Sequence, residues 1–394
     1  MNTHPTPEAI SHSQRICFVA PFGLRLKGTV RARILPLAKV LAQRGSEVIV
    51  LIPPWDSPDD GGKSWQDGGV RIVNVSVRGG LPLILGRMIR EIRGFGPEIL
   101  HIVKPRAHAG LIQWLFWQLR RSGPRIFLDV DDWEQAWEGV AGYAWPVARF
   151  LAWQEEWGIR HADGITAASR WLEKRVNDYA PDTPILYLPN GVPDTDAPIL
   201  SGQPSSGQPP TILIFSRFVE VDPAWMGEFW AAMQQKVPNV RLIVAGQGIQ
   251  PHHEAAMRVV IEAATIPSTP PNVIWLGYID PPALAAATHT ADCAIFPAAN
   301  IPLNQAKCSV RLATTLMAGL PVVASAVGEQ VNYAAGGAAR LVDADASPAD
   351  FAQAVADLLA APQDRVALAA QARRHLVEEY DWEKLGERLD DFYA

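Results

Sequence analysis

The chain has 394 residues, of which 48% are hydrophobic and 19% are charged. At roughly 100–200 residues per domain this length predicts two or three domains, and the apolar share excludes a disordered chain. A net charge of −6 with a pI of about 5.9 argues against a strongly basic nucleic-acid binder.

The charge is unevenly distributed along the chain. Residues 1–125 carry 18 Lys and Arg against 8 Asp and Glu, whereas residues 201–394 carry 12 against 20. A basic N-terminal third suggests an anionic partner, such as a phosphate or an anionic membrane surface. Ordinary surface charge is the alternative interpretation.

The cysteines and the N-terminus indicate the compartment. Cys17, Cys293 and Cys308 are far apart and form no CxxC, which excludes a disulfide framework and a zinc site. Residues 1–14 lack the apolar centre of a signal peptide, and the apolar run 111–119 is too short to span a bilayer. We therefore expect a cytoplasmic protein that is soluble or peripheral at the inner face of the membrane.

From residue 15 onward, short β-branched runs alternate with amphipathic segments. This alternation predicts a doubly wound α/β domain over 15–195, preceded by a disordered tail over 1–14. Val30, Ile34, Leu37 and Leu41 mark one face of its first helix. The predicted strands are 15–21, 46–53, 70–77, 98–104, 125–132, 164–169 and 185–190.

A Ser/Gly/Pro-rich stretch then predicts a linker over 196–210. The alternation restarts and predicts a second α/β domain over 211–378, followed by a C-terminal helix over 379–394. The carboxyl ends of parallel strands bind ligands, so two such domains facing each other would share a cleft. The predicted strands are 211–218, 240–246, 272–279, 293–298, 321–325 and 338–343.

Two glycine-containing loops follow predicted strands. In PFGLRLKGT, Gly23 and Gly28 permit close approach to an anion, and Arg25 and Lys27 add positive charge. A turn that simply needs glycine is the alternative. The loop GQGIQP has Pro251 where a dinucleotide fingerprint has glycine, and no P-loop motif is present.

Carboxylates are crowded at the end of one predicted strand, in FLDVDDWEQAW. Asp129, Asp131, Asp132 and Glu134 could hold a cation, accept hydrogen bonds from a polyol, or include one group with a raised pKa. Asp132 could instead cap the following helix. We expect a functional role for at least one of Asp131 and Asp132.

Cations stand at strand ends in the second domain. Arg217 ends its first strand, and Lys307 and Arg311 flank the start of a helix. Three such cations suit a diphosphate, whose departing charge needs electrostatic stabilisation. The alternative is three surface cations.

Tryptophans are concentrated between residues 114 and 171. Most are expected in the core, where large apolar rings belong. Trp114 and Trp117, beside Arg120 and Arg121, are the best candidates for contact with a membrane surface.

Several segments together resemble the retaining family 4 glycosyltransferases of the GT-B fold. They stand in the family's order over essentially the whole chain: the glycine-containing loop after the first strand, ADGITAAS, LPNGV, SRF, VAGQG, VIWLGYI, LMAGLPVVASAVGE and the terminal YDWEKLGERLDDFY.

The resemblance implies two Rossmann-like domains around a cleft, with a C-terminal crossover helix that returns to the first domain. It implies transfer of a hexose from a nucleotide sugar, most simply a UDP- or GDP-sugar, without a metal ion or other cofactor. The acceptor would be a glycan, a lipid-linked molecule or a small molecule, held by the N-terminal domain. The expected catalytic residues are Asp131, Asp132 and Lys307. The expected donor-binding residues are Gly28, Arg217, Lys307, Arg311, Thr314 and Glu329.

The chain departs from the family at the donor site. The family's Glu-x7-Glu pair falls at Ala306 and Thr314, and its histidine after the fifth strand appears as Asp131. The lysine expected after Arg217 is missing around Asp222, and the acidic residue expected after VGE is Asn332, with Glu329 nearby.

Lys307 and Arg311 could bind the diphosphate instead, and Glu220 or Glu329 could bind hydroxyls. Two other classes stay open: a catalytically inactive binding or scaffold subunit, and an epimerase or phosphorylase on the same fold.

Overall fold

The computed structural model describes residues 13–25, 28–120, 123–193, 208–269 and 271–394. Most of the predicted tail 1–14 and of the predicted linker 196–210 lies outside the described residues, as do Lys27 and Arg121. Within these ranges, no helix is long and apolar enough to cross a membrane.

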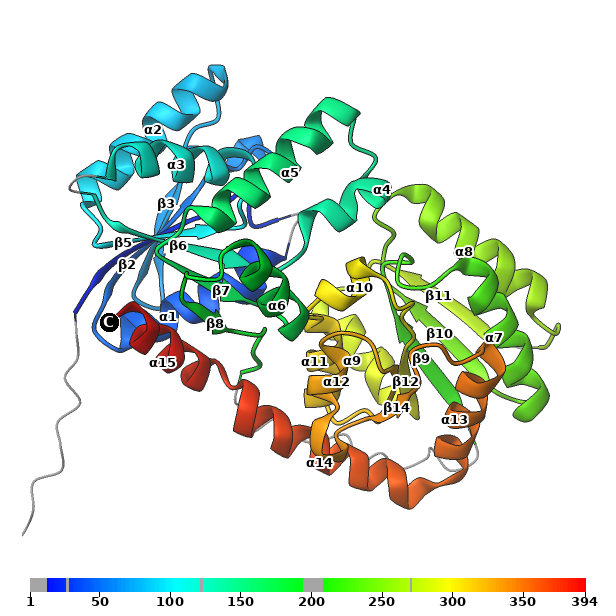
Figure 1. The fold of residues 1–394 in the computed structure, drawn as a ribbon. Helices are drawn as coiled ribbons and strands as arrows, with labels where there is room; N and C mark the ends of the chain where they lie inside the picture. Colours follow the sequence, from blue (N-terminus) through cyan, green and yellow to red (C-terminus); the bar gives the residue numbers. More distant parts are fainter. Residues whose placement is uncertain (1–12, 26–27, 121–122, 194–207, 270) are drawn as a thin grey trace, which may run out of the picture.

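The first domain is built on an eight-stranded sheet with the order β3-β4-β2-β1-β5-β6-β7-β8 (Figure 1). All neighbouring strands are parallel except β3 and β4. Its central strands are buried and mostly apolar because helices cover both faces. The strands are β1 Arg15–Val19, β2 Glu47–Ile52, β3 Ser64–Asp67, β4 Val70–Asn74, β5 Ile99–Val103, β6 Arg125–Val130, β7 Gly164–Ala167 and β8 Ile185–Tyr187. The helices are η1 Val30–Ile34, α1 Leu35–Gln43, η2 Pro58–Asp60, α2 Gly80–Phe95, α3 Ala107–Gln118, η4 Glu134–Trp137, α4 Glu138–Ala141, α5 Trp145–Arg160 and α6 Arg170–Tyr179.

The second domain has a six-stranded parallel sheet with the order β11-β10-β9-β12-β13-β14. The two sheets confirm the predicted architecture of two doubly wound α/β domains. The strands are β9 Thr211–Phe215, β10 Arg241–Ala245, β11 Val273–Gly277, β12 Cys293–Phe296, β13 Val322–Ser325 and β14 Arg340–Val342. The helices are α7 Pro223–Lys236, α8 Pro251–Ala264, α9 Pro281–Thr290, α10 Pro302–Ala306, α11 Val310–Met317, α12 Gln330–Tyr333, η5 Ala335–Gly337, α13 Pro348–Ala360 and α14 Pro362–Tyr380.

The last helix, α15 (Trp382–Tyr393), returns to the first domain and packs on α1, as Figure 1 shows in red. At the crossing, the Val192 N–H donates to the Tyr380 carbonyl (2.8 Å), and the Trp382 N–H donates to the Val192 carbonyl (3.2 Å). At its far end the hydroxyl of Tyr393 bonds to the buried His101 ring. The predicted crossover helix is therefore present.

One strand, β3, was missed by the sequence analysis. Its residues, Ser64 to Asp67, are mostly exposed and polar except for Trp65, so they lack the apolar pattern of the other strands. It pairs with β4 through Gly68 and Gly69, whose φ values of 57° and 83° fit a two-residue hairpin turn that only glycine-like residues adopt readily. The hairpin makes β3 the antiparallel edge of the sheet.

Candidate active site between the two domains

A cavity of about 510 Å³ lies between the domains. The loop after β1 and the start of η1 line it from the first domain, and the loops after β9 and β10 line it from the second. These are carboxyl ends of parallel strands, so the predicted shared cleft is present. The lining residues are Arg25, Gly28, Arg31, Phe215, Ser216, Arg217, Gly246, Gln247, Gly248, Tyr278, Ile279 and Arg311.

Two glycines, Gly246 and Gly28, shape the walls of this cleft. Gly246 has a φ of 122°, and a Cβ built there would stand 1.9 Å from the carbonyl oxygen of Ser216. The loops after β9 and β10 therefore touch only because residue 246 has no side chain. At Gly28 a Cβ would meet no atom within 4 Å, so packing within the chain leaves this side of the cleft open.

The cleft is strongly cationic. Arg25 pairs with Asp60 (2.7 Å) and Arg311 with Glu220 (2.7 Å). The guanidinium groups of Arg31 and Arg217 have no ion pair within the described residues. Two of the four arginines that line the cavity are thus outside any ion pair of the described residues, which suits an anionic ligand.

Glu220 organises the second-domain wall. Its carboxylate accepts hydrogen bonds from the Ser216 hydroxyl (2.8 Å) and from the backbone N–H of Arg217 (3.2 Å), which fixes the loop after β9. It also pairs with Lys307 (3.5 Å) and Arg311 (2.7 Å). Burial alone would raise the pKa of Glu220, but these two cations and the Ser216 bond hold it well below its usual range. Glu220 therefore stays ionised and keeps both cations in place.

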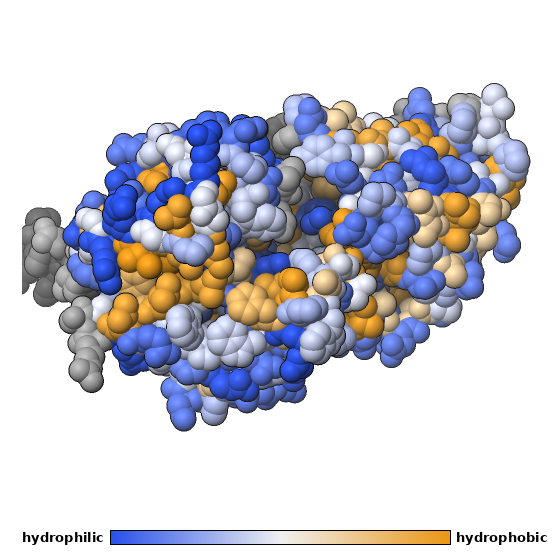
Figure 2. All heavy atoms as spheres, turned by 90° about the horizontal axis from the view of Figure 1, so that it is seen from above, coloured by the Kyte–Doolittle hydropathy of each residue, from blue (hydrophilic) through white to orange (hydrophobic). Residues whose placement is uncertain are grey.

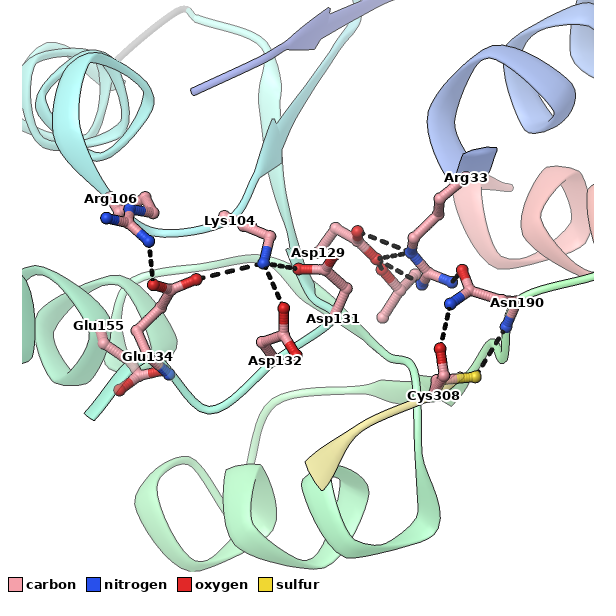
Figure 3. Close-up of polar contacts among 11 residues, drawn as sticks. Arg33, Lys104, Arg106, Asp129, Asp131, Asp132, Glu134, Glu155, Asn190 and Cys308 are labelled. Atoms are coloured by element: carbon pink, nitrogen blue, oxygen red, sulfur yellow. Dashed lines mark hydrogen bonds and ion pairs between the residues drawn. The ribbon is translucent and has the colours of Figure 1, made fainter. Parts of the chain in front are cut away.

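Lys104 is the centre of a buried carboxylate cluster in the first domain (Figure 3). Its ammonium lies 3.0 Å from Asp131, 2.6 Å from Asp132 and 3.2 Å from Glu134, and its side chain is only 6% exposed. Lys104 follows β5 with a φ of 59°, a strained value for a residue that is not glycine. Arg106 pairs with the other oxygen of Glu134. Two cations thus face three carboxylates at the end of the strand.

Two carboxyl groups near this cluster hold protons at unusually high pH. Burial raises the pKa of Asp131 to about 7. The charge of Lys104 acts against this rise, and the charges of Asp132 and Asp129 add to it. Burial also raises the pKa of Glu155 to about 8. Glu155 accepts the backbone N–H groups at the start of η4, at 2.7 and 3.2 Å. Near neutral pH, Asp131 is therefore poised between its two protonation states.

The carboxylate cluster faces the second domain. Asp132 interacts electrostatically with both Lys307 and Arg217. The Lys307 ammonium also lies 5.2 Å from the ring centre of Trp137, which η4 presents toward it. Burial and the neighbouring Arg311 nevertheless lower the pKa of Lys307. The predicted catalytic residues of the two domains are therefore brought to one place.

The structure brings only some of the predicted donor-binding residues to this cavity. Gly28, Arg217 and Arg311 line the same cavity. Lys307 lies beside it, in a small pocket of about 30 Å³ that Glu220 also lines.

Thr314 and Glu329 do not line this cavity. Thr314 is exposed on α11, and its hydroxyl donates to the Val310 carbonyl of its own helix (2.9 Å). Glu329 is buried between the domains, where it accepts hydrogen bonds from the Arg170 N–H (3.2 Å) and the Tyr187 hydroxyl. Its carboxylate joins the two domains, so a contact with a donor hydroxyl would require those bonds to open.

Sequence reasoning missed Lys104 and the role of Asp129. The sequence places Lys104 only at the end of the predicted strand 98–104. Asp129 forms a fully buried ion pair with Arg33 (2.6 Å), and Arg33 also donates to Asn190 (3.3 Å), so Asp129 anchors the start of the first helix. The available signal was a lysine at the carboxyl end of one predicted strand together with carboxylates at the carboxyl end of the next predicted strand. Among the described residues, no group of three or more His, Cys, Asp or Glu side chains could hold a metal ion.

Two family models match the chain in succession. The glycosyl transferase 4-like domain matches residues 28–191, and the glycosyl transferases group 1 model matches residues 209–361. A curated relative, the phosphatidyl-myo-inositol mannosyltransferase of Mycolicibacterium smegmatis, is 28% identical over 96% of this chain and 93% of its own length.

Solved structures show the same fold. Sucrose-phosphate synthase from Thermosynechococcus elongatus superimposes with a TM-score of 0.74 at 18% identity, over 96% of this chain and 98% of the other. Anabaena HepE, solved with UDP-glucose, gives 0.67 at 14% identity, over 96% and 99%. The chain therefore belongs to glycosyltransferase family 4, the enzymes that transfer a sugar from a nucleotide-sugar donor, and has the GT-B fold.

Proposed function

We propose that the chain is a retaining, metal-independent hexosyltransferase that uses a UDP- or GDP-sugar. The second domain (211–378) holds the nucleotide sugar, and the first domain (15–195) holds the acceptor, with 379–394 packed back on it. The observation that carries the proposal is the cavity between them, which Arg31 lines from the first domain and Arg217 from the second, neither in an ion pair within the described residues. A diphosphate is the anion that such a site suits.

In this mechanism the diphosphate is the leaving group. Arg217 and Arg311 bind its oxygens from the second domain, and Gly28 leaves room for it at the first. Fixed cations in a site shielded from water stabilise the charge that develops as the glycosidic bond breaks. Glu220 keeps Arg311 and Lys307 oriented before the donor arrives, which avoids reorganisation during the reaction.

The acceptor hydroxyl attacks the sugar from the side on which the diphosphate leaves, and its proton passes to a diphosphate oxygen. Asp131 and Asp132 orient the hydroxyl from the first domain, and no covalent bond to the protein forms. Because its pKa is about 7, Asp131 can either donate or accept a hydrogen bond near neutral pH. Lys307 lies across the cleft from them.

The acceptor is proposed to be lipid-linked or a glycan. The mannosyltransferase relative acts, by its name, on phosphatidyl-myo-inositol. An acceptor of that class would bring this enzyme to the cytoplasmic face of a membrane. The UDP-glucose bound to Anabaena HepE supports a uridine nucleotide as the first donor to test.

The second candidate is an inactive subunit that keeps the fold and binds a partner or nucleotide. Ala306 and Thr314 replace the family's two glutamates, and Glu329 is occupied by contacts between the domains. The two candidates differ in turnover, because a scaffold would hydrolyse no nucleotide sugar.

The test measures binding and turnover separately. Arg217→Ala is expected to weaken UDP or GDP binding by roughly tenfold to a hundredfold, the effect of one lost charged hydrogen bond. Arg258→Ala, on the outer helix α8, is the matched control and should bind as the wild type does. Asp131→Asn should depress turnover and spare nucleotide binding. A folded wild type that binds no nucleotide and hydrolyses no donor would refute the proposal.

A further inference from the structure

The outer surface of the first domain carries exposed aromatic side chains on α5. Trp145 is 71% exposed, Phe150 41% and Trp153 44%, with Val147 beside them. Residues 147, 150 and 153 are three apart, so they lie on one face of the helix. Soluble surfaces seldom gather large apolar side chains in this way without a function.

The aromatic contacts continue from α5 to α3. The ring of Phe150 lies 5.8 Å from that of Trp153, and Trp153 lies 6.2 Å from Trp157. Trp157 stacks on His161, which in turn meets Trp117 of α3 at 5.3 Å. The aromatic side chains therefore form one continuous series across two packed helices.

This series differs from the pair that the sequence suggested. Trp114 is 37% exposed on α3, but Trp117 is partly buried, with the Arg120 guanidinium 3.8 Å above its ring. Most of the exposed aromatic surface comes instead from α5. We call Trp114, Trp145, Val147, Phe150 and Trp153 the aromatic face.

Basic side chains border the aromatic face. Helix α2 packs against α3 and carries the exposed Arg90 and Arg93, with Glu91 as its one acidic residue, whereas Arg87 donates to the Ser76 and Arg78 carbonyls. On α5, Arg149 is exposed and has no ion pair within the described residues. Figure 2 looks onto this side of the molecule and shows apolar clusters over the first domain, bordered by hydrophilic side chains. The surface thus combines apolar rings with excess positive charge.

We propose that the aromatic face docks on the surface of a bilayer that contains anionic lipids. Tryptophan has an apolar body and one polar N–H, which places it at the boundary between headgroups and acyl chains. The surrounding arginines favour negatively charged headgroups. A second copy of the chain would bring these same arginines together without neutralising them, which argues against self-association through this face.

The docking helix also reaches the candidate active site. The inner side of α5 carries Glu155, which holds the N–H groups of Glu134 and Gln135, and the same short helix presents Trp137 to Lys307. Docking would therefore hold the acceptor side of the cleft near the bilayer. This last step rests on the proposed lipid-linked acceptor, whereas the docking itself does not.

The test is co-sedimentation of the full chain with vesicles at low salt. We expect binding to phosphatidylcholine vesicles that contain phosphatidylglycerol, and much weaker binding to phosphatidylcholine alone. The double variant Trp145→Ser, Trp153→Ser should lose about tenfold or more in binding to the anionic vesicles. Val259→Ser with Ile266→Ser removes two exposed apolar side chains from the second domain and is the matched control.

The outcomes separate docking from catalysis. Absence of binding at low salt, equal binding to both vesicle types, or equal losses in the two double variants would each overturn the proposal. Sedimentation velocity could instead show a dimer that the tryptophan double variant loses and the control double variant keeps. That result would overturn the proposal, because the aromatic face would then bind a second copy of the chain. Nucleotide binding by the double variant, measured in solution, should match the wild type.

Discussion

Replacing Lys104 by methionine tests how much the carboxylate cluster contributes to stability. The substitution keeps the length and apolar stem of the side chain but removes the ammonium that lies within 3.2 Å of all three carboxylates, Asp131, Asp132 and Glu134. Removing one partner of a buried ion pair costs about 3–5 kcal/mol because the other charge stays buried. We expect Lys104→Met to lower the free energy of unfolding at pH 7.5 by about that amount.

The loss should depend on pH. The charge of Lys104 lowers the pKa of Asp131, so without it the folded-state pKa of Asp131 rises further above its ordinary value. A carboxyl group with a raised pKa in the folded state favours folding at low pH, and this contribution is lost as pH rises through that pKa. The penalty of Lys104→Met should therefore be smaller at pH 5 than at pH 7.5, by roughly 0.5–0.8 kcal/mol.

The assay is urea unfolding followed by tryptophan fluorescence, because many of the chain's tryptophans lie in the first domain. Lys39→Met is the matched control: Lys39 pairs with Asp67 at 2.7 Å, but both side chains are more than a third exposed. Its loss should stay below about 1 kcal/mol. Equal losses for the two variants, or a Lys104→Met loss that does not change with pH, would refute the reasoning.

Three further predictions follow from named contacts. In the wild type, the raised pKa of Asp131, about 7, should make the free energy of unfolding fall as pH rises from about 4 to about 7, and Asp131→Asn should remove this decrease. Urea unfolding at pH 5 and pH 8 measures it, and the same difference between the two pH values in wild type and variant would contradict it. Gly246→Ala should weaken UDP or GDP binding more than about tenfold in calorimetry, because its Cβ would displace the Ser216 carbonyl; wild-type affinity would show that the loop is not part of the site. Glu155→Gln should cost less in unfolding free energy at pH 7 than Glu155→Ala, because the carboxyl is mostly protonated there and the amide oxygen of Gln still accepts one of the two backbone N–H groups. Glu155→Ala should cost about 1–3 kcal/mol by leaving backbone N–H groups unpaired, and equal costs for these two variants would exclude that account.

Most of the fold could be predicted because local pattern and burial agree in this chain. Strands such as β2, from Val48 on, and β12 are unbroken apolar runs, and parallel strands buried on both faces have that composition. The edge strand β3 fails this pattern because its residues face solvent. Its one signal was the Gly68-Gly69 pair, which fits a tight hairpin.

The candidate site was only partly predictable. The positions of Gly28, Arg217 and Arg311 at strand or helix ends placed them at one edge of each sheet, and the structure puts them on one cavity. Their roles in binding the donor stay predictions. Glu329 could not be located from its motif, because its burial depends on Tyr187 in the other domain.

Lys104 was concealed for a different reason. It ends a run that looks like any buried strand, and its three carboxylate partners come from a segment that is distant in sequence. Which cation neutralises a carboxylate cluster is decided by how strands pair in the sheet. A single sequence read locally does not contain that information.

The crossing of the chain between the domains limits how the cleft can open. The two passages are joined to each other, through Val192 on one and Tyr380 and Trp382 on the other, so they form a double-stranded hinge. An opening that keeps these bonds must be a swing about that hinge rather than a slide. Far from it, α4 meets α8 where Gln250 donates to the Ala141 carbonyl at 3.3 Å. A swing of the lobes about the hinge would break that bond, whereas the bonds at Val192 would be kept.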